Sequence, residues 1–86
     1  MMDEQTVYYA ITGVGQNPIE PSGLVRRRFT KKGRLDEALR SDMTWQRDTA
    51  IIEWEYGNLV GDLLQISEAE ARELIERFRE KWSQES

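Results

Sequence analysis

Six cationic side chains lie close together in the segment GLVRRRFTKKGR, residues 23–34, and they are the clearest candidates for binding a ligand. Guanidinium and ammonium groups bind anions, so this run could contact phosphates, a nucleic acid or the carboxylates of a protein. The whole chain nevertheless carries a net charge of −4. The six cations are Arg26, Arg27, Arg28, Lys31, Lys32 and Arg34. The question is whether they form one anion-binding surface.

The sequence offers little to a catalytic site. Its 86 residues include no Cys and no His, which excludes thiolate catalysis, Cys-based metal sites and His-based catalytic triads. Carboxylates are plentiful, but a catalytic carboxylate needs burial or a charge partner in a cleft. Gly13 and Gly15 do not complete a phosphate-binding G-x-G-x-x-G motif, because Pro18 occupies its last position. We therefore expect a non-catalytic chain without a cofactor or a metal ion.

Two strands must position the cationic run. Residues 6–12, TVYYAIT, and residues 24–30, LVRRRFT, have strand-like composition, and the Gly- and Pro-containing segment 15–23 predicts a loop. Strands joined by a short loop usually pair as an antiparallel hairpin. Side chains alternate along a strand, so the second strand has one face with Leu24, Arg26 and Arg28 and another with Val25, Arg27 and Phe29.

Strand alternation therefore separates Arg27 from its neighbours. If Val25 and Phe29 pack under a helix, Arg27 lies between them and points inward, as inward charges on edge strands do. It would then need a carboxylate partner, for which Glu53 and Glu55 are the candidates, and whether Arg27 is buried stays open. The other five cations remain available to an external anion, and they are Arg26, Arg28, Lys31, Lys32 and Arg34.

The middle of the chain is harder to interpret. Residues 31–34, KKGR, predict a turn, and residues 35–40, LDEALR, predict one or two helical turns. Residues 48–57, DTAIIEWEYG, alternate as a strand would, yet Asp48 suits a helix N-cap and Gly57 a helix end. We favour a short helix there and keep the strand as the alternative.

The C-terminal part of the chain carries the strongest pattern. Residues 61–66, GDLLQI, predict a short strand, and Ser67 with Glu70 forms a capping box before an apolar stripe at helical spacing. We expect this helix to pack on the strand face that carries Val7, Tyr9, Ile11 and Val25. The stripe consists of Ala71, Leu74, Ile75, Phe78 and Trp82.

Together these elements predict an α+β fold. It comprises a small antiparallel sheet of about three strands, namely the N-terminal hairpin and a later strand, packed by a C-terminal amphipathic helix. One or two short helices occupy the middle. The length suits a single domain over residues 1–86, with residues 1–5 and 83–86 frayed.

A family resemblance accompanies this pattern. The stretches PSGLVRR, LDEAL, EYGNLVGDLLQIS and SEAEARELIERFREKW together resemble short bacterial proteins of actinobacterial type with no characterised activity. The resemblance covers most of the chain and implies a small α+β domain. Its motifs are not catalytic signatures, so it transfers no site residue.

The function expected from these features is a non-catalytic protein-interaction module, which could be a homodimer. Tyr8, Trp45 and Trp54 are candidate contact residues, because aromatic side chains are enriched at interfaces. The alternative is an anion- or nucleic-acid-binding surface at residues 26–34, although among the aromatics only Tyr8 is a candidate for base stacking. No apolar run is long enough to span a membrane and no signal peptide is recognisable, so we expect a cytoplasmic location.

Overall fold

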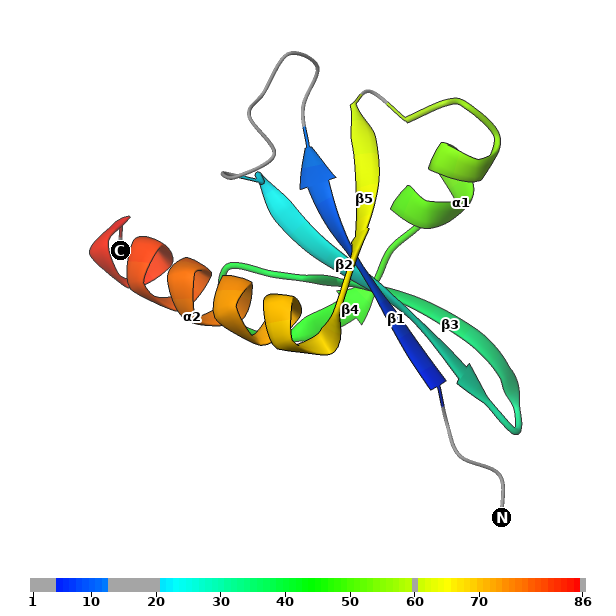
Figure 1. Cartoon of the computed structure of the whole chain (residues 1–86), viewed down its shortest axis with the longest axis horizontal. Helices are drawn as coiled ribbons and strands as arrows, with labels where there is room; N and C mark the ends of the chain where they lie inside the picture. Colours follow the sequence, from blue (N-terminus) through cyan, green and yellow to red (C-terminus); the bar gives the residue numbers. More distant parts are fainter. Residues whose placement is uncertain (1–4, 13–20, 60, 86) are drawn as a thin grey trace.

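The computed structural model describes residues 5–12, 21–59 and 61–85, and it contains one antiparallel sheet (Figure 1). The spatial order of the strands is β4-β3-β2-β1-β5, so β2, with its three arginines, is the central strand. The strands are β1 (Gln5–Thr12), β2 (Gly23–Thr30), β3 (Gly33–Leu39), β4 (Trp45–Arg47) and β5 (Asp62–Ile66).

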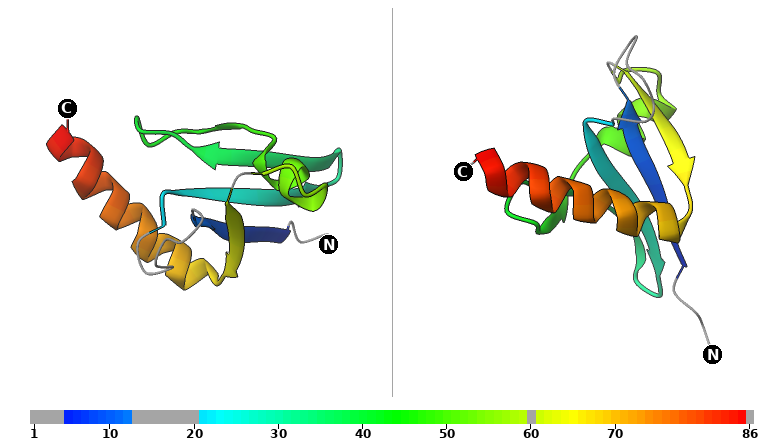
Figure 2. Two further views of the ribbon diagram at one scale, coloured as in Figure 1. Left: turned by 90° about the horizontal axis from the view of Figure 1, so that it is seen from above. Right: turned by 60° about the vertical axis from the view of Figure 1, so that its left-hand side comes forward.

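Two helices cover the sheet from opposite sides (Figures 1 and 2). The short helix α1 (Ala50–Glu55) precedes β5, and the long helix α2 (Glu68–Glu85) follows it directly. The α+β class, the antiparallel hairpin of β1 with β2 and the C-terminal helix are thus confirmed. Within the described residues, neither helix is long and apolar enough to cross a membrane.

The predicted number of strands, about three, was wrong, because the sheet has five. The segment LDEALR was expected to be helical, yet residues 33–39 form β3, paired with β2 from Val25↔Ala38 to Thr30↔Gly33. Leu, Glu and Ala are good helix formers, but hydrogen bonding to a central strand outweighs a propensity of a few tenths of a kcal/mol per residue. The segment that was expected to be a loop, residues 15–23, lies largely outside the described residues, and Gly23 begins β2.

The long helix packs on the face opposite to the expected one. Its stripe meets Ala10, Leu24 and Leu39, with Tyr8 and Trp45 at the border of this cluster. The face with Val25 instead packs on α1, mainly through Ile51, which is 1% exposed. The prediction failed because β1 is apolar on both faces, so strand alternation alone could not assign a face to either helix.

Local capping explains where α2 begins. The Ser67 hydroxyl accepts a hydrogen bond from the Glu70 amide (3.1 Å), and the Glu70 carboxylate accepts one from the Ser67 amide (3.1 Å), so the capping box is confirmed. The helix prediction within residues 48–57 is also confirmed, since α1 spans Ala50–Glu55. Its N-cap residue is Thr49, which makes no side-chain cap hydrogen bond, whereas the expected N-cap residue Asp48 lies one position earlier and accepts the Ala50 amide at 2.7 Å. The end of α1 is followed by Gly57, whose φ of +76° favours glycine.

Part of each terminal segment that was expected to fray lies within a described strand or helix. Gln5 belongs to β1, and α2 continues past Trp82 through Ser83 to Glu85. Stacking of Trp82 on Phe78, with ring centroids 4.8 Å apart, supports this last part of the helix. Residues 1–4 and 86 lie outside the described part of the chain.

Candidate functional site: the arginine network and the hairpin surface

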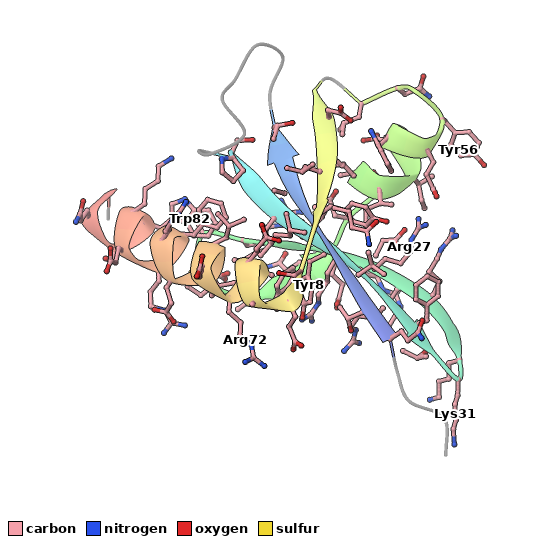
Figure 3. The ribbon with its side chains drawn as sticks, in the orientation of Figure 1. Tyr8, Arg27, Lys31, Tyr56, Arg72 and Trp82 are labelled. Carbon is pink, nitrogen blue, oxygen red and sulfur yellow. The ribbon has the colours of Figure 1, made fainter. Side chains whose placement is uncertain are left out.

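The three consecutive arginines of β2 point to both faces of the sheet, and Arg27 is the buried one. Its side chain is 8% exposed and lies between α1 and β3 (Figure 3). Asp36 binds it side-on, through Nε–Oδ1 (2.9 Å) and Nη2–Oδ2 (3.1 Å). Glu55 binds it end-on, through Nη1–Oε2 (2.9 Å) and Nη2–Oε1 (3.0 Å). One guanidinium therefore serves two carboxylates in bidentate geometry, the strongest form of this ion pair.

Two elements bring these carboxylates to Arg27. Asp36 is its direct cross-strand partner in the β2–β3 register, and Glu55 is the last residue of α1. Glu55 was one of the two expected candidates. Asp36, rather than Glu53, supplies the second carboxylate, and Arg27 lies on the central strand rather than on an edge.

The charges within this network shift two pKa values in the direction expected for ion pairs. Hydrogen bonds from Arg27 lower the pKa of the Glu55 carboxyl, and the nearby Arg34 charge contributes to this shift. The same bonds, with Glu55 first and Asp36 second, raise the pKa of Arg27 above its already high ordinary value. The guanidinium thus stays charged at any working pH, and the network acts as a fixed structural bridge between α1, β2 and β3.

Arg26 and Arg28 point to the opposite face and share one carboxylate. Glu37 Oε1 lies 2.9 Å from Arg26 Nε and 3.3 Å from Arg28 Nε. The first contact is a hydrogen bond, whereas the Arg28 Nε atom is buried without hydrogen-bond geometry to any acceptor in the described residues. Arg26 also covers the ring of Trp45, with its guanidinium carbon 4.0 Å from the ring centroid. These two arginines are therefore already occupied by groups of their own chain.

The three candidate aromatic residues belong to two different core clusters. Tyr8 and Trp45 lie together on the α2 side, with ring centroids 6.3 Å apart. Trp54 lies on the α1 side, 5.8 Å from the ring of Tyr9, and its indole N–H donates to Asp62 at 2.6 Å. All three are partly buried, so the structure does not gather them into one contact surface.

The remaining cations cluster at the tip of the β2–β3 hairpin, which Figure 3 marks with Lys31. Lys31, Lys32 and Arg34 are exposed there, and in the described residues none of the three has a carboxylate within 4.0 Å. Phe29, the cross-strand partner of Arg34, is 44% exposed, although we expected it to be buried. We call Phe29, Lys31, Lys32 and Arg34 the hairpin surface.

The turn that presents the hairpin surface is well defined locally. The Thr30 hydroxyl donates to the Gly33 carbonyl (2.9 Å) and accepts the Lys32 amide (3.2 Å). Gly33 has φ of +125°, a conformation that other residues rarely adopt. The sequence T-K-K-G thus fixes a tight turn, so the two lysines and Arg34 are held at one end of the sheet.

Sequence reasoning missed three residues of this region, namely Asp36, Glu37 and Phe29. A signal for the first two existed. A tight turn at T-K-K-G pairs Thr30 with Gly33, and counting back along both strands places Arg27 opposite Asp36 and Arg26 opposite Glu37. The exposure of Phe29 depends on where α1 ends, which local pattern does not reveal.

The other candidate sites in the described residues are two pockets and the acidic side chains. A pocket of about 240 Å³ lies beside β5 and α2, and another of about 340 Å³ lies beside Asp36 and Asp48. Within the described ranges, no three acidic side chains gather closely enough to hold a metal ion. The hairpin surface is therefore the main candidate contact site.

Comparisons with known proteins found no matching family model, no matching curated protein and no matching solved structure. The resemblance to short bacterial proteins of actinobacterial type thus stays a prediction.

Proposed function

We propose that this protein is a non-catalytic protein-interaction module that uses the hairpin surface to bind a partner carrying carboxylates and apolar side chains. The observation that carries the proposal is Phe29, 44% exposed on the strand that leads to three exposed cations. Large apolar side chains are normally withdrawn from water, and aromatic and Arg side chains are enriched among the residues that contribute most to protein–protein binding.

The arginine network supports this proposal by elimination. Arg27 is bound by two carboxylates, and Arg26 and Arg28 share Glu37. Within the part of the chain that the structure describes, the other three cations of the segment, Lys31, Lys32 and Arg34, have no carboxylate within 4.0 Å, so they can attract an acidic partner. The hairpin surface is thus a small cationic patch with an apolar centre rather than a long cationic track.

The alternative function is binding of an anion or a nucleic acid through residues 26–34. Fewer of these residues can contact such a ligand than the sequence suggested. Single-stranded nucleic acids are held by successive aromatic stacking contacts along a cationic groove. The hairpin surface offers one aromatic ring, Phe29, so it lacks the run of stacking contacts that such binding uses. Self-association remains part of the proposal, and a cytoplasmic location remains a prediction from the sequence.

The test is an amide NMR titration of the full chain with three anionic probes. They are an amphipathic peptide of Glu and Leu, a poly-glutamate peptide of equal charge, and an oligo-dT of equal charge. We expect the amphipathic peptide to bind most tightly, with shifts centred on residues 29–34. Phe29→Ser should abolish its advantage over poly-glutamate, because the apolar contact is lost.

A matched pair of charge reversals completes this test. Lys31→Glu with Lys32→Glu should weaken both peptides, whereas Arg79→Glu with Lys81→Glu on α2 makes the same charge change elsewhere and should have little effect. Tighter binding of oligo-dT than of either peptide would replace the proposal with the nucleic-acid alternative. Absence of binding to all three probes at low salt would contradict both.

A further inference from the structure

The two edges of the sheet differ in the way they are protected. At one edge lie the short strand β4 and the part of β3 that extends past it, which carry Arg34, Asp36 and Arg47. At the other edge β5 pairs with β1 alone among the described strands. After Asp62, all residues of β5 are uncharged and none is Pro. Charges and prolines are the usual devices that prevent an edge strand from pairing with another chain. In β5 the one such residue is Asp62 at its start, whose carboxylate accepts the Leu63 amide at 2.8 Å, and residues 63–66 carry none.

An exposed apolar side chain lies on this edge strand. Leu64 is 48% exposed, and it lies on the α2 side of the sheet because it pairs with Ala10. The pocket of about 240 Å³ next to it is lined by Leu64, Ile66 and Leu74 and by three charged side chains of α2, namely Glu70, Glu73 and Arg77. An apolar side chain thus borders a hollow with a mixed apolar and charged lining.

We propose that β5 pairs with β5 of a second copy of this chain, in antiparallel orientation, to form a continuous sheet across a two-fold axis. The register that pairs all five β5 residues is centred on Leu64, which then faces Leu64 of the second copy, while Asp62 faces Ile66. A two-fold axis perpendicular to the sheet keeps α2 of both copies on the same face. Each Leu64 then lies next to the hollow of the other copy.

The second copy is favoured over an unrelated strand because the edge is self-complementary. Residues 63–66 are uncharged, so the centre of the strand meets itself without the repulsion that like charges in register would cause.

This inference deepens the proposed function by naming one partner, but it uses a different surface. The hairpin surface lies at the tip of β2 and β3, and the Gln5↔Phe29 pairing lies beyond the part of β1 that β5 covers, Tyr8 to Thr12. A dimer built on β5 therefore leaves both hairpin surfaces accessible. The two proposals can accordingly fail independently.

The absence of native cysteine makes a single introduced cysteine a specific reporter of this pairing. We expect Leu64→Cys to form a disulfide-linked dimer under mild oxidation at least about tenfold faster than Tyr56→Cys, because directly facing side chains of an antiparallel pair are close enough to be bridged. Tyr56 is the control, since it is more exposed than Leu64, at 77% against 48%, and belongs to neither proposed surface. Equal rates for the two variants would overturn the proposed interface.

Sedimentation equilibrium of the wild-type chain supplies the second readout. We expect a monomer–dimer equilibrium whose dissociation constant rises at least about tenfold in Leu64→Lys, which adds an edge charge at an exposed position. Tyr56→Lys, at an exposed position outside both proposed surfaces, should leave the equilibrium unchanged. A monomer at every concentration, or a dimer that Leu64→Lys does not weaken, would overturn the inference, and the peptide titration would still decide the proposed function.

Discussion

Two neighbouring parts of one strand show how differently the same residue type is used in this protein. Arg27 faces α1, is 8% exposed and has a carboxylate on each of two sides. Arg26 and Arg28 face the α2 side, are 17% and 35% exposed, and share the single carboxylate of Glu37. The first arrangement gives one guanidinium two acids, whereas the second gives two guanidinium groups one acid.

This difference predicts different energetic roles. Removing one partner of a buried ion pair leaves an uncompensated charge, which is strongly destabilising. Arg27 and Asp36 are 8% and 7% exposed and bind each other in bidentate geometry, whereas Arg26 and Glu37 are 17% and 15% exposed and share a single hydrogen bond. Arg27 should therefore contribute most to stability, and Arg26 and Arg28 less.

The largest effect is expected for Arg27→Met, which retains an apolar stem but leaves Asp36 and Glu55 without a counter-charge. We expect a loss of about 3 kcal/mol in the free energy of unfolding, the lower end for breaking a buried pair, because Glu55 remains half exposed to water. Urea denaturation measures this loss. Arg28→Met is the matched control, and a similar loss in both variants would remove the distinction between the two faces.

The next largest losses of stability are expected for the carboxylates that pair with these arginines, Asp36 with Arg27 and Glu37 with Arg26 and Arg28. Asp36→Asn should cost about 2 kcal/mol, because Asp36 is 7% exposed and binds Arg27 in bidentate geometry. Glu37→Gln should cost about 1 kcal/mol, since one directed hydrogen bond to Arg26 is weakened at a partly exposed position. Chemical denaturation of both variants gives the comparison. A larger loss for Glu37→Gln would reverse our ranking of the two faces.

The pH dependence of stability should include a contribution from the Arg27 side of the sheet. Because Arg27 lowers the pKa of Glu55 in the folded state, Glu55 contributes stability above its unfolded pKa of about 4.5. This contribution is lost as the pH falls through the lower folded pKa. Thermal unfolding followed across acidic pH should thus show a smaller decline in Glu55→Gln than in the wild-type chain.

Asp42 provides a control for that acid titration. Hydrogen bonds from Thr44 lower the pKa of Asp42 in the same direction, but Asp42 lies in the turn between β3 and β4, away from Arg27 in the sequence. Asp42→Asn should remove a separate part of the acid dependence. If the stability of Glu55→Gln declined with falling pH as much as that of the wild-type chain, the pairing of Glu55 with Arg27 would contribute nothing to stability in solution.

The smallest effect is expected on the α2 side, for Arg26→Lys. Lysine retains the charge but loses the planar group that lies over Trp45, so we expect a loss of about 0.5 kcal/mol. Tryptophan fluorescence during urea unfolding can measure it. A loss comparable to that of Arg27→Met would show that Arg26 is structural as well.

The residue pattern could predict part of this arrangement. Strand alternation correctly separated Arg27 from Arg26 and Arg28, and the capping box correctly located the start of α2. The segment LDEAL has a helix-forming composition, so β3 was not predicted as a strand. Its residues Asp36 and Glu37 were therefore not predicted as cross-strand partners of the arginines. Residues 61–66 were correctly predicted as a strand, which is β5 in the fold. Pairing between strands depends on segments distant in sequence, so local propensity could reveal neither β3 and β4 nor which helix covers which face.

The measurement that tests this account most directly is a pair of double-mutant cycles, one for Arg27 with Asp36 and one for Arg26 with Glu37. The variants are Arg27→Met with Asp36→Asn, and Arg26→Met with Glu37→Gln. We predict a coupling free energy of about 2 kcal/mol for the first pair and less than about 1 kcal/mol for the second. Equal coupling energies, or a first coupling near zero, would contradict the assignment of Arg27 as the structural member of the arginine run.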